Sequence, residues 1–182
     1  MARNKRDIDR KDKQDEIIVI ARALFLAQGY EATSMAQVAR DAGVAPNTLY
    51  WYFTDKDDLL IAVLNGLVLA SLSEYTQLGS ASIKEQLVWL IAQLEQSKRL
   101  VFTVHARVEQ SQTVQLWHSQ FHQMLDHLIV EKLIANGLLK EQAIVIATAG
   151  TFIVEGLLTH PHSAQQRDSV IDWLIAQTFS TV

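Results

Sequence analysis

The stretch SMAQVARDAGVAPNTLYWYF, residues 34–53, decides the fold of this chain. Its first half carries apolar residues three or four positions apart, as on one face of a helix: Met35, Val38, Ala39 and Ala42. Gly43 then ends that helix, because glycine readily adopts the left-handed conformation found at helix C-termini. Pro46 suits the first turn of a second helix, where its missing N–H needs no partner. The stretch therefore predicts two short helices joined by a tight turn.

The residues around this stretch extend the helical pattern in both directions. Ser34 and Gln37 match a capping box, in which both side chains satisfy N–H groups at a helix start. Upstream, a helix is predicted over about residues 14–28, ended by Gly29, and the charged residues 1–13 are predicted to be a flexible arm. Downstream, Asp55 is a candidate N-cap for a long helix that reaches about residue 75.

The whole chain is predicted to be all-α. Prolines occur only at positions 46 and 161, and strand-like alternation is scarce. Further helices are expected over about residues 82–97, 100–109, 113–136, 141–160 and 164–179. The predicted organisation is a three-helix helix-turn-helix domain over residues 14–60, joined by the long fourth helix to a C-terminal helical domain over residues 61–182.

Composition narrows the class of protein. The chain has 182 residues, 49% of them hydrophobic and 20% charged, which is typical of a globular protein. It has no cysteine, which excludes disulfides and thiolate-bound zinc, and we see no signal-peptide pattern and no run of about 18 apolar residues. We therefore expect a cytoplasmic protein without a membrane partner. The net charge of −4 excludes a uniformly basic coat, so any contact with nucleic acid must be local.

The second short helix, about residues 46–53, is too short and too polar at its start to be a buried core helix. A recognition helix of this form presents its N-terminal residues to the DNA major groove. By position, the residues that would face the duplex are Pro46, Asn47, Thr48, Tyr50 and Trp51. The alternative for the aromatic residues is a place in the core. We expect a core position for Leu49 and for Phe53.

An ordered string of motifs resembles the TetR family of transcriptional regulators. The motifs are Ala23-Leu24-Phe25, Gly29-Tyr30, Ala32-Thr33-Ser34-Met35, Val38-Ala39, Ala42-Gly43-Val44, residues 48–53 and residues 56–60. The resemblance covers about the first third of the chain. It implies a homodimeric repressor that binds a palindromic double-stranded operator and releases it when a small-molecule effector binds the C-terminal domain, residues 61–182, which would be the ligand-binding and dimerisation domain. Separately, no catalytic motif is visible, so we expect no enzymatic activity and no cofactor.

The resemblance also assigns roles to individual residues. It implies phosphate or backbone contacts by Thr33, Ser34, Thr48, Tyr52 and Lys56. Asn47 and Trp51 are the candidates for base edges, since asparagine pairs with adenine and an aromatic ring packs on a thymine methyl. Two features depart from the family pattern: Ala45 stands where a Ser or Thr N-cap is usual, and the recognition helix has no Lys or Arg.

The C-terminal region suggests an interface and a pocket. Residues 141–160 are apolar nearly all round, so we expect this helix to be buried on every side and, with residues 164–179, to form a two-fold interface. The alternative is the central helix of a monomer. The resemblance implies a ligand pocket in this region, although plain core is the commoner role for its aromatic residues. Candidate ligand-binding residues are Trp89, Phe102, His105, Glu109, Trp117, His118, Phe121, His122, Met124, Phe152 and Glu155.

Several alternatives stay open at this point. His118 and His122 have the i, i+4 spacing of shared metal ligands, but surface or interhelical hydrogen bonding is the commoner role, and we assign no metal. Arg3 or Arg6 of the arm could enter a minor groove, although a solvated arm is more usual. The C-terminal domain could instead recruit a protein partner, and an α-helical enzyme or carrier using the His-rich middle is a third class, although no catalytic motif is visible.

Overall fold

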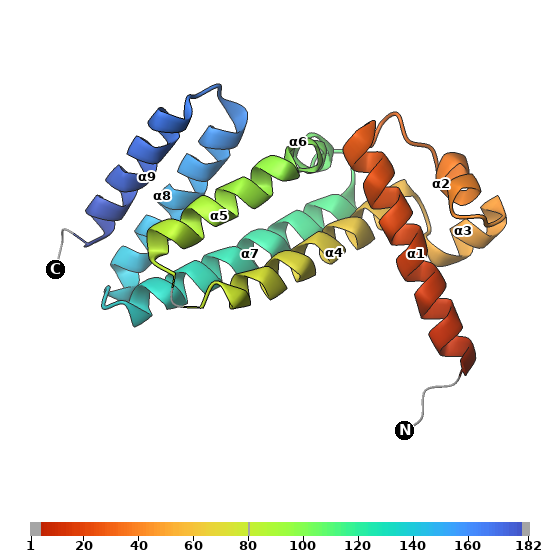
Figure 1. Cartoon of the computed structure of the whole chain (residues 1–182), viewed down its shortest axis with the longest axis horizontal. Helices are drawn as coiled ribbons and strands as arrows, with labels where there is room; N and C mark the ends of the chain where they lie inside the picture. The colour runs from red at the N-terminus through yellow and green to blue at the C-terminus, as the bar shows by residue number, and fades with distance from the viewer. Residues whose placement is uncertain (1–4, 80, 180–182) are drawn as a thin grey trace. The chain divides into compact units, whose positions relative to one another are not determined.

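The computed structural model describes residues 5–79 and 81–179 of the chain, and Figure 1 shows them as helices joined by short turns. No strand occurs in these residues, which confirms the all-α prediction. The helices are α1 (Lys5–Ala27), α2 (Met35–Asp41), α3 (Pro46–Tyr52), α4 (Lys56–Gln77), α5 (Ile83–Gln96), α6 (Lys98–Arg107), α7 (Gln112–Ala135), α8 (Lys140–Thr159) and α9 (Ala164–Phe179). All but α1 begin and end within two residues of the predicted bounds.

The helices form two compact units. Unit 1 comprises the chain up to Glu74 together with Arg99–Trp117, and unit 2 comprises Tyr75–Lys98 and the chain from His118 onward. Unit 1 therefore includes the predicted helix-turn-helix domain, residues 14–60, but also most of α4, α6 and the start of α7. The predicted boundary at residue 60 marks a functional division, which this grouping does not test.

Helix α1 differs from its prediction, because it begins at Lys5 instead of about residue 14. Residues 5–13 are helical, so the prediction of a flexible arm is wrong for them; Arg3 and the side chain of Arg6 lie outside the described residues. The extension is held at Lys13, whose Nζ donates to the carbonyl oxygen of Ala42 at 3.0 Å and pairs with Glu16 at 2.8 Å. Such tertiary contacts are invisible in the local sequence.

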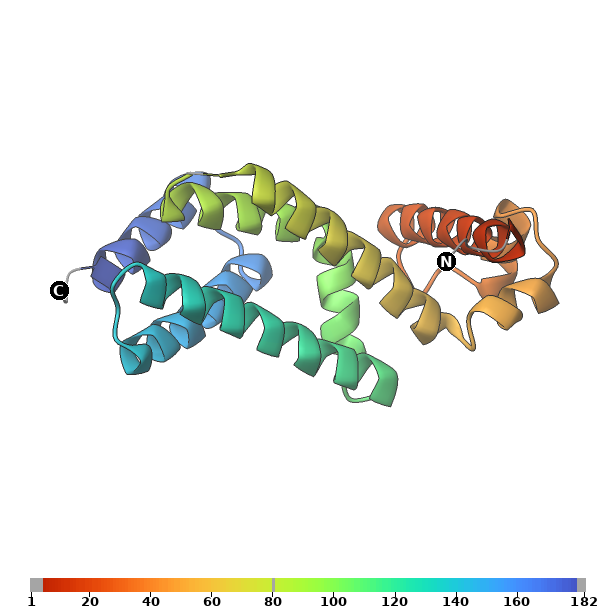
Figure 2. The same ribbon diagram turned by 90° about the horizontal axis from the view of Figure 1, so that it is seen from below.

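The core of unit 1 explains the order of its helices. One stripe of α1 is fully buried, and it packs with apolar residues of α2, α3, α4 and α6. Figure 2 shows the ribbons of α1, α2 and α3 grouped together. The largest fully buried side chains of this core include Ile17, Phe25, Leu49, Phe53, Leu59 and Leu60. Gly29 and Gly43 both have positive φ, at 94° and 65°, as their predicted roles at helix ends require.

The start of α2 confirms only half of the predicted capping box. Ser34 is the N-cap, and its Oγ accepts from the Gln37 N–H at 3.1 Å. The Gln37 side chain turns instead to Gln28, whose Nε2 donates to Gln37 Oε1 at 2.9 Å. A complete capping box stands at the start of α5, formed by Ser82 and Glu85.

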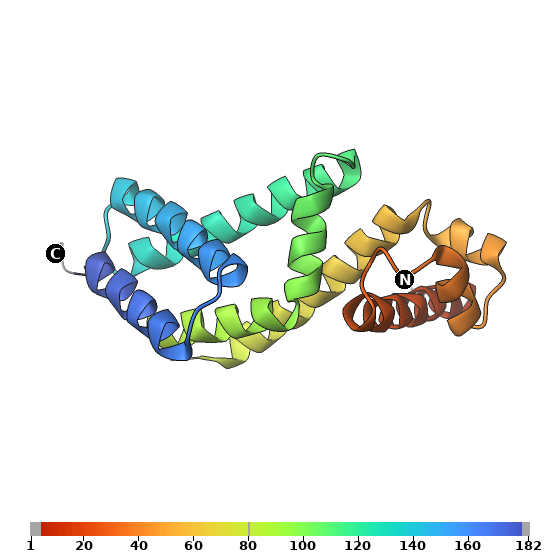
Figure 3. The same cartoon turned by 90° about the horizontal axis from the view of Figure 1, so that it is seen from above.

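Unit 2 places α5 beside both α8 and α9, and α8 and α9 lie side by side (Figures 1 and 3). Within one chain, α8 is not buried on every side: Ile144 is 46% exposed, and Val145 and Phe152 are each 68% exposed. The predicted burial on every side requires the predicted second copy and stays a prediction. Trp173 of α9 is also exposed. One copy of unit 2 therefore leaves several apolar side chains of α8 exposed.

Two helices qualify our expectation about membranes. By length and composition alone, α4 and α8 are each long and apolar enough to cross a bilayer. Core helices of soluble proteins pass the same test, and α4 buries Leu59, Leu60, Val63 and Leu64 in unit 1.

Candidate nucleic-acid interface

Helix α3 is anchored by two side chains and exposes the others. Leu49 is fully buried and Phe53, at the C-cap, is 2% exposed, as the sequence predicted. The exposed residues are Pro46, Asn47, Thr48, Tyr50 and Trp51, the set predicted to face DNA. Tyr52 is half-buried against the core. The two anchors thus fix a short helix whose N-terminal polar residues and two aromatic rings face outward.

The start of α3 is open, as expected from Ala45. Ala45 has the extended conformation of an N-cap, with φ −66° and ψ 147°, but it has no side chain to accept a hydrogen bond. Pro46 occupies the first turn, where its missing N–H leaves no unpaired donor. The exposed Thr48 backbone N–H is held by the Ala45 carbonyl at 2.9 Å.

At the start of α2, the structure separates two residues that were predicted to act together. Ser34 is exposed and available to a phosphate. Thr33 is only 1% exposed, and its Oγ1 donates to the Gly29 carbonyl at 2.8 Å and accepts from Gln28 Nε2 at 3.0 Å. Its side chain has no surface to offer DNA, so the predicted phosphate contact by Thr33 is corrected to a structural role in the turn before α2.

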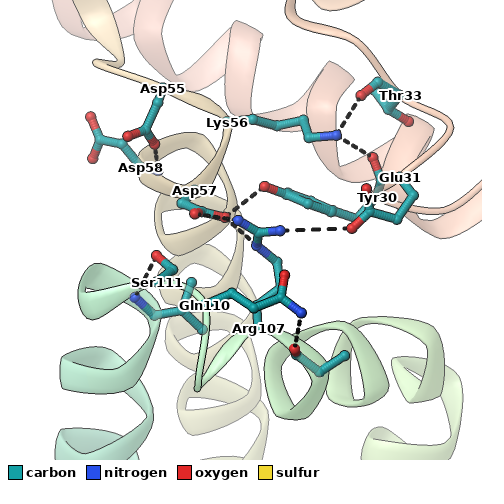
Figure 4. Close-up of polar contacts among 12 residues, drawn as sticks. Tyr30, Glu31, Thr33, Asp55, Lys56, Asp57, Asp58, Arg107, Gln110 and Ser111 are labelled. Atoms are coloured by element: carbon teal, nitrogen blue, oxygen red, sulfur yellow. Dashed lines mark hydrogen bonds and ion pairs between the residues drawn. The ribbon is translucent and has the colours of Figure 1, made fainter.

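Lys56 is also engaged within the protein (Figure 4). Its Nζ donates to the carbonyl oxygens of Tyr30 at 3.0 Å and Thr33 at 3.1 Å, and it lies 4.1 Å from the centre of the Tyr30 ring. An ammonium group has three donors, so one N–H is left for a phosphate. Lys56 fastens the loop between α1 and α2 to the start of α4.

A polar cluster beside Lys56 was not foreseen from the sequence (Figure 4). The Tyr30 hydroxyl donates to Asp57 Oδ1 at 2.6 Å, and Arg107 of α6 donates to both Asp57 oxygens. Burial alone would raise the pKa of Asp57, but hydrogen bonds from Arg107, Tyr30 and Ser111 outweigh it and hold that pKa below the usual range of an aspartate. Burial, followed by the Asp57 carboxylate, raises the pKa of Tyr30. The cluster therefore keeps Asp57 ionised and Tyr30 protonated.

A second unforeseen contact reaches α3 itself. The guanidinium carbon of Arg10, on the N-terminal extension of α1, lies 4.0 Å from the centre of the Trp51 ring. The sequence of residues 5–13 did not decide between a helix and a flexible arm, because a charged segment without an apolar stripe is compatible with both.

The predicted ligand-binding residues divide between the two units. In unit 1, Phe102, His105 and Glu109 are exposed, and Trp117 is half-buried with its Nε1 donating to Asn65 Oδ1 at 2.8 Å. In unit 2, the half-buried residues are Trp89, His118, Phe121, His122, Met124 and Glu155. Phe152 is exposed on α8. A hollow between α7 and α8 is lined by other residues, among them His127, Val130, Ile144 and Ala147.

The structure brings several unit 2 candidates together. The Nε2 atoms of His118 and His122 are 3.1 Å apart, the His122 ring lies edge-on to Phe121, and His122 Nε2 is 3.7 Å from Glu155 Oε1. These contacts are those of hydrogen-bonding residues on α7 and α8. Among the described residues, no group of three or more His, Asp or Glu side chains is arranged to hold a metal ion.

The geometry of unit 1 defines a helix-turn-helix DNA-binding domain, with α3 as its projecting helix. Residues 17–63 match the sequence profile of the family described as bacterial regulatory proteins, tetR family. Over this domain, about a quarter of its length, the chain is similar to the TetR family.

Individual proteins support the same assignment. The chain is 40% identical to the HTH-type transcriptional regulator HbdR of Aromatoleum sp. (strain CIB), over 32% of this chain and 25% of that protein. It is 41% identical to AcrR of Shigella flexneri, over 28% of this chain and 26% of that protein. The match thus spans about a quarter of the length of these relatives.

Solved structures extend the likeness of fold to nearly the whole chain. A transcriptional regulator of Saccharomonospora viridis in complex with choline superposes with a TM-score of 0.72 at 17% identity, covering 91% of this chain and 96% of that one. A TetR-family regulator of Mesorhizobium loti gives a TM-score of 0.70 at 24% identity, covering 93% and 96%. The all-α architecture, including the C-terminal helices, is that of TetR-family regulators.

Proposed function

We propose that this protein is a ligand-responsive homodimeric repressor that binds a palindromic DNA operator in the cytoplasm. The observation that carries the proposal is the exposure of Asn47, Thr48 and the α3 rings on a helix anchored by Leu49 and Phe53. Asn47 is the candidate for adenine, since its amide offers both a donor and an acceptor in the major groove. Ser34 and Thr48 are candidates for backbone contacts, and Lys56 has one donor left for a phosphate.

The exposed side of α8 supports the dimer. Val145, Phe152 and the small residue Ala149 between them recur at three- and four-residue spacing, and all three are exposed. Trp173 on the neighbouring α9 is a further exposed apolar side chain of unit 2. A second copy of the same surface would cover it as a four-helix bundle, and a two-fold dimer suits a palindromic operator.

A small-molecule effector is the proposed regulator. The polar cluster of His118, His122 and Glu155 lies among half-buried apolar residues of unit 2, an environment that orients a ligand through a few polar groups. Choline, found with the Saccharomonospora viridis neighbour, is a reasonable first probe. To release DNA, the effector must favour the non-binding state, because coupling cannot exceed its differential affinity for the two states.

Operator selection tests the proposal. The purified full chain is used to enrich duplexes from a random pool, and binding to the enriched site is measured against salt concentration. We expect a palindromic site bound with a steep salt dependence, since neutralising phosphates releases counterions. A compound screen with choline as first member then seeks loss of operator binding. Absence of salt-sensitive binding to any duplex would overturn the DNA-binding proposal, and a screen without any hit would overturn its ligand-responsive part.

A further inference from the structure

The recognition helix has a cation beside it although its own sequence has none. Helix α3, PNTLYWY, contains no lysine or arginine. Arg10 of α1 supplies one: its guanidinium carbon lies 4.0 Å from the centre of the Trp51 ring, within the range of a cation–π contact. Trp51 is 59% exposed, and Arg10 is exposed as well. The guanidinium group of Arg10 therefore lies over the Trp51 ring at the surface of α3.

The placement of Arg10 is supported by the helix that carries it. Residues 5–13 continue α1, so Arg10 projects from a regular helix. Three residues later, Lys13 is bound to the Ala42 carbonyl oxygen in the turn between α2 and α3. This bond ties the extension of α1 to the turn that orients α3, so Arg10 and Trp51 are held by connected elements.

Stacking leaves the hydrogen-bonding capacity of Arg10 unused. A cation–π contact uses the charge of the guanidinium and none of its five N–H donors. Within the described residues, Arg10 makes no hydrogen bond and no ion pair. Its fork of donors matches the oxygens of a phosphate and is pre-oriented by the ring.

We propose that Arg10 binds a phosphate of the operator backbone and that Trp51 is the platform that positions it. The proposal rests on the DNA binding proposed above. Trp51 is next to the last residue of α3, whereas base edges are read mainly by the N-terminal residues of a recognition helix, and the first helix of such domains crosses the backbone. In this proposal, Trp51 positions Arg10 and does not pack on a thymine methyl.

The test is a double-mutant cycle on DNA affinity with the full chain. The variants are Arg10→Ala, Trp51→Ala and the double variant, with Arg22→Ala as the matched control, an exposed arginine further along α1. Each is titrated with the selected operator and with an unrelated duplex over a range of salt. Both changed side chains are exposed, so circular dichroism and thermal melting should match those of the wild type.

The phosphate assignment predicts a specific pattern. Arg10→Ala should weaken binding about tenfold on both duplexes and make the slope of log K against log salt less steep by about 0.9. Trp51→Ala should cost about threefold more in the wild type than in the Arg10→Ala background. Arg10→Lys should keep the salt slope but lose affinity, because lysine keeps the charge without the fork. Arg22→Ala should leave affinity unchanged.

Three results would overturn the inference while leaving the proposed function standing. They are wild-type affinity in Arg10→Ala, a changed base preference in Arg10→Ala, and strictly additive effects of the two substitutions. The first result would show that Arg10 makes no contact with DNA. The second would show that Arg10 contacts a base edge and not a phosphate. The third would show that Trp51 does not position Arg10. If the wild type binds no duplex, the proposed function fails, and this inference fails with it.

Discussion

The Arg107 guanidinium donates two hydrogen bonds to the Asp57 carboxylate, from Nε to Oδ1 at 2.6 Å and from Nη2 to Oδ2 at 2.7 Å. The two residues are 50 positions apart in the sequence. Both side chains are largely buried, 20% and 13% exposed. The pair joins the end of α6 to the start of α4, immediately beside the Tyr30 and Lys56 contacts that hold the loop before α2. These contacts therefore connect α6, the start of α4 and the loop before α2 within unit 1.

Breaking this pair should destabilise the protein. In Arg107→Met, the Asp57 carboxylate keeps its partly buried place but loses both guanidinium bonds, and we expect a loss of about 2 kcal/mol in the free energy of unfolding, less than for a fully buried pair. Urea denaturation measures the change. Glu31→Gln is the control, because Glu31 faces the same guanidinium at 3.7 Å but is 80% exposed, and its loss should cost at most about 0.5 kcal/mol. Equal effects of the two substitutions would refute a special role for Asp57.

The stability contributed by Asp57 should depend on pH in the acid range. The folded pKa of Asp57 is lowered, so its contribution is complete above the pKa of an unfolded aspartate and is lost as the pH falls through the folded value. The wild type should therefore exceed Asp57→Asn by a constant free energy of unfolding from about pH 5 to 7, and by progressively less below about pH 4. Urea titrations at several pH values measure this, with Asp15→Asn as an exposed-carboxylate control. A difference that does not shrink in acid would contradict the assignment.

The sequence predicted most of this architecture because its signals are local. Apolar spacing, Gly29, Gly43 and Asp55 each act within a turn of the helix they shape, and the α2 and α3 bounds follow from them. The N-terminal extension of α1 escaped prediction, because its stability comes from contacts with Ala42 and Trp51, far along the chain.

The sequence predicted the exposed residues of the candidate site, but it did not predict the contacts within the protein that hold the site in place. Position along α3 sufficed to list the exposed residues. It could not show that Thr33 is buried, since its exposed neighbour Ser34 has the same hydroxyl chemistry. Nor could it pair Asp57 with Arg107, because charged residues on separate helices give no spacing pattern. The apolar pattern of α8 predicts burial, but it does not show whether the same chain or a second copy covers the exposed face.

Lys56 should have two separable roles. Lys56→Met removes the donations to the Tyr30 and Thr33 carbonyl oxygens, so the free energy of unfolding should fall by about 1 kcal/mol. If its remaining N–H binds a phosphate, the slope of log K against log salt for operator binding should also become less steep by about 0.9. Lys84→Met, which removes an exposed lysine from unit 2, is the control. An unchanged slope in a folded variant would restrict Lys56 to its structural role.

The apolar face of α8 should control association. Val145→Glu places a charge on the proposed two-fold interface, where burying it without a partner is costly, and we expect the dimer dissociation constant to rise at least about tenfold. Sedimentation equilibrium measures it. Leu69→Glu is a matched control, because Leu69 and Val145 are both 68% exposed and Leu69 belongs to α4 in unit 1. Dimers of unchanged strength in Val145→Glu would place the interface elsewhere.

Restoring the missing N-cap of α3 should stabilise the helix-turn-helix domain. Ala45 already has extended φ and ψ, and the Thr48 N–H lies three residues on, where a serine Oγ at position 45 would accept from it. We expect Ala45→Ser to raise the free energy of unfolding by about 1 kcal/mol, whereas Ala36→Ser, an exposed change inside α2, should lower it slightly because serine is a poorer helix former than alanine. Thermal melting of the two variants gives the comparison. If Ala45→Ser is no more stable than Ala36→Ser, then Pro46 already holds the start of α3 as firmly as a cap would.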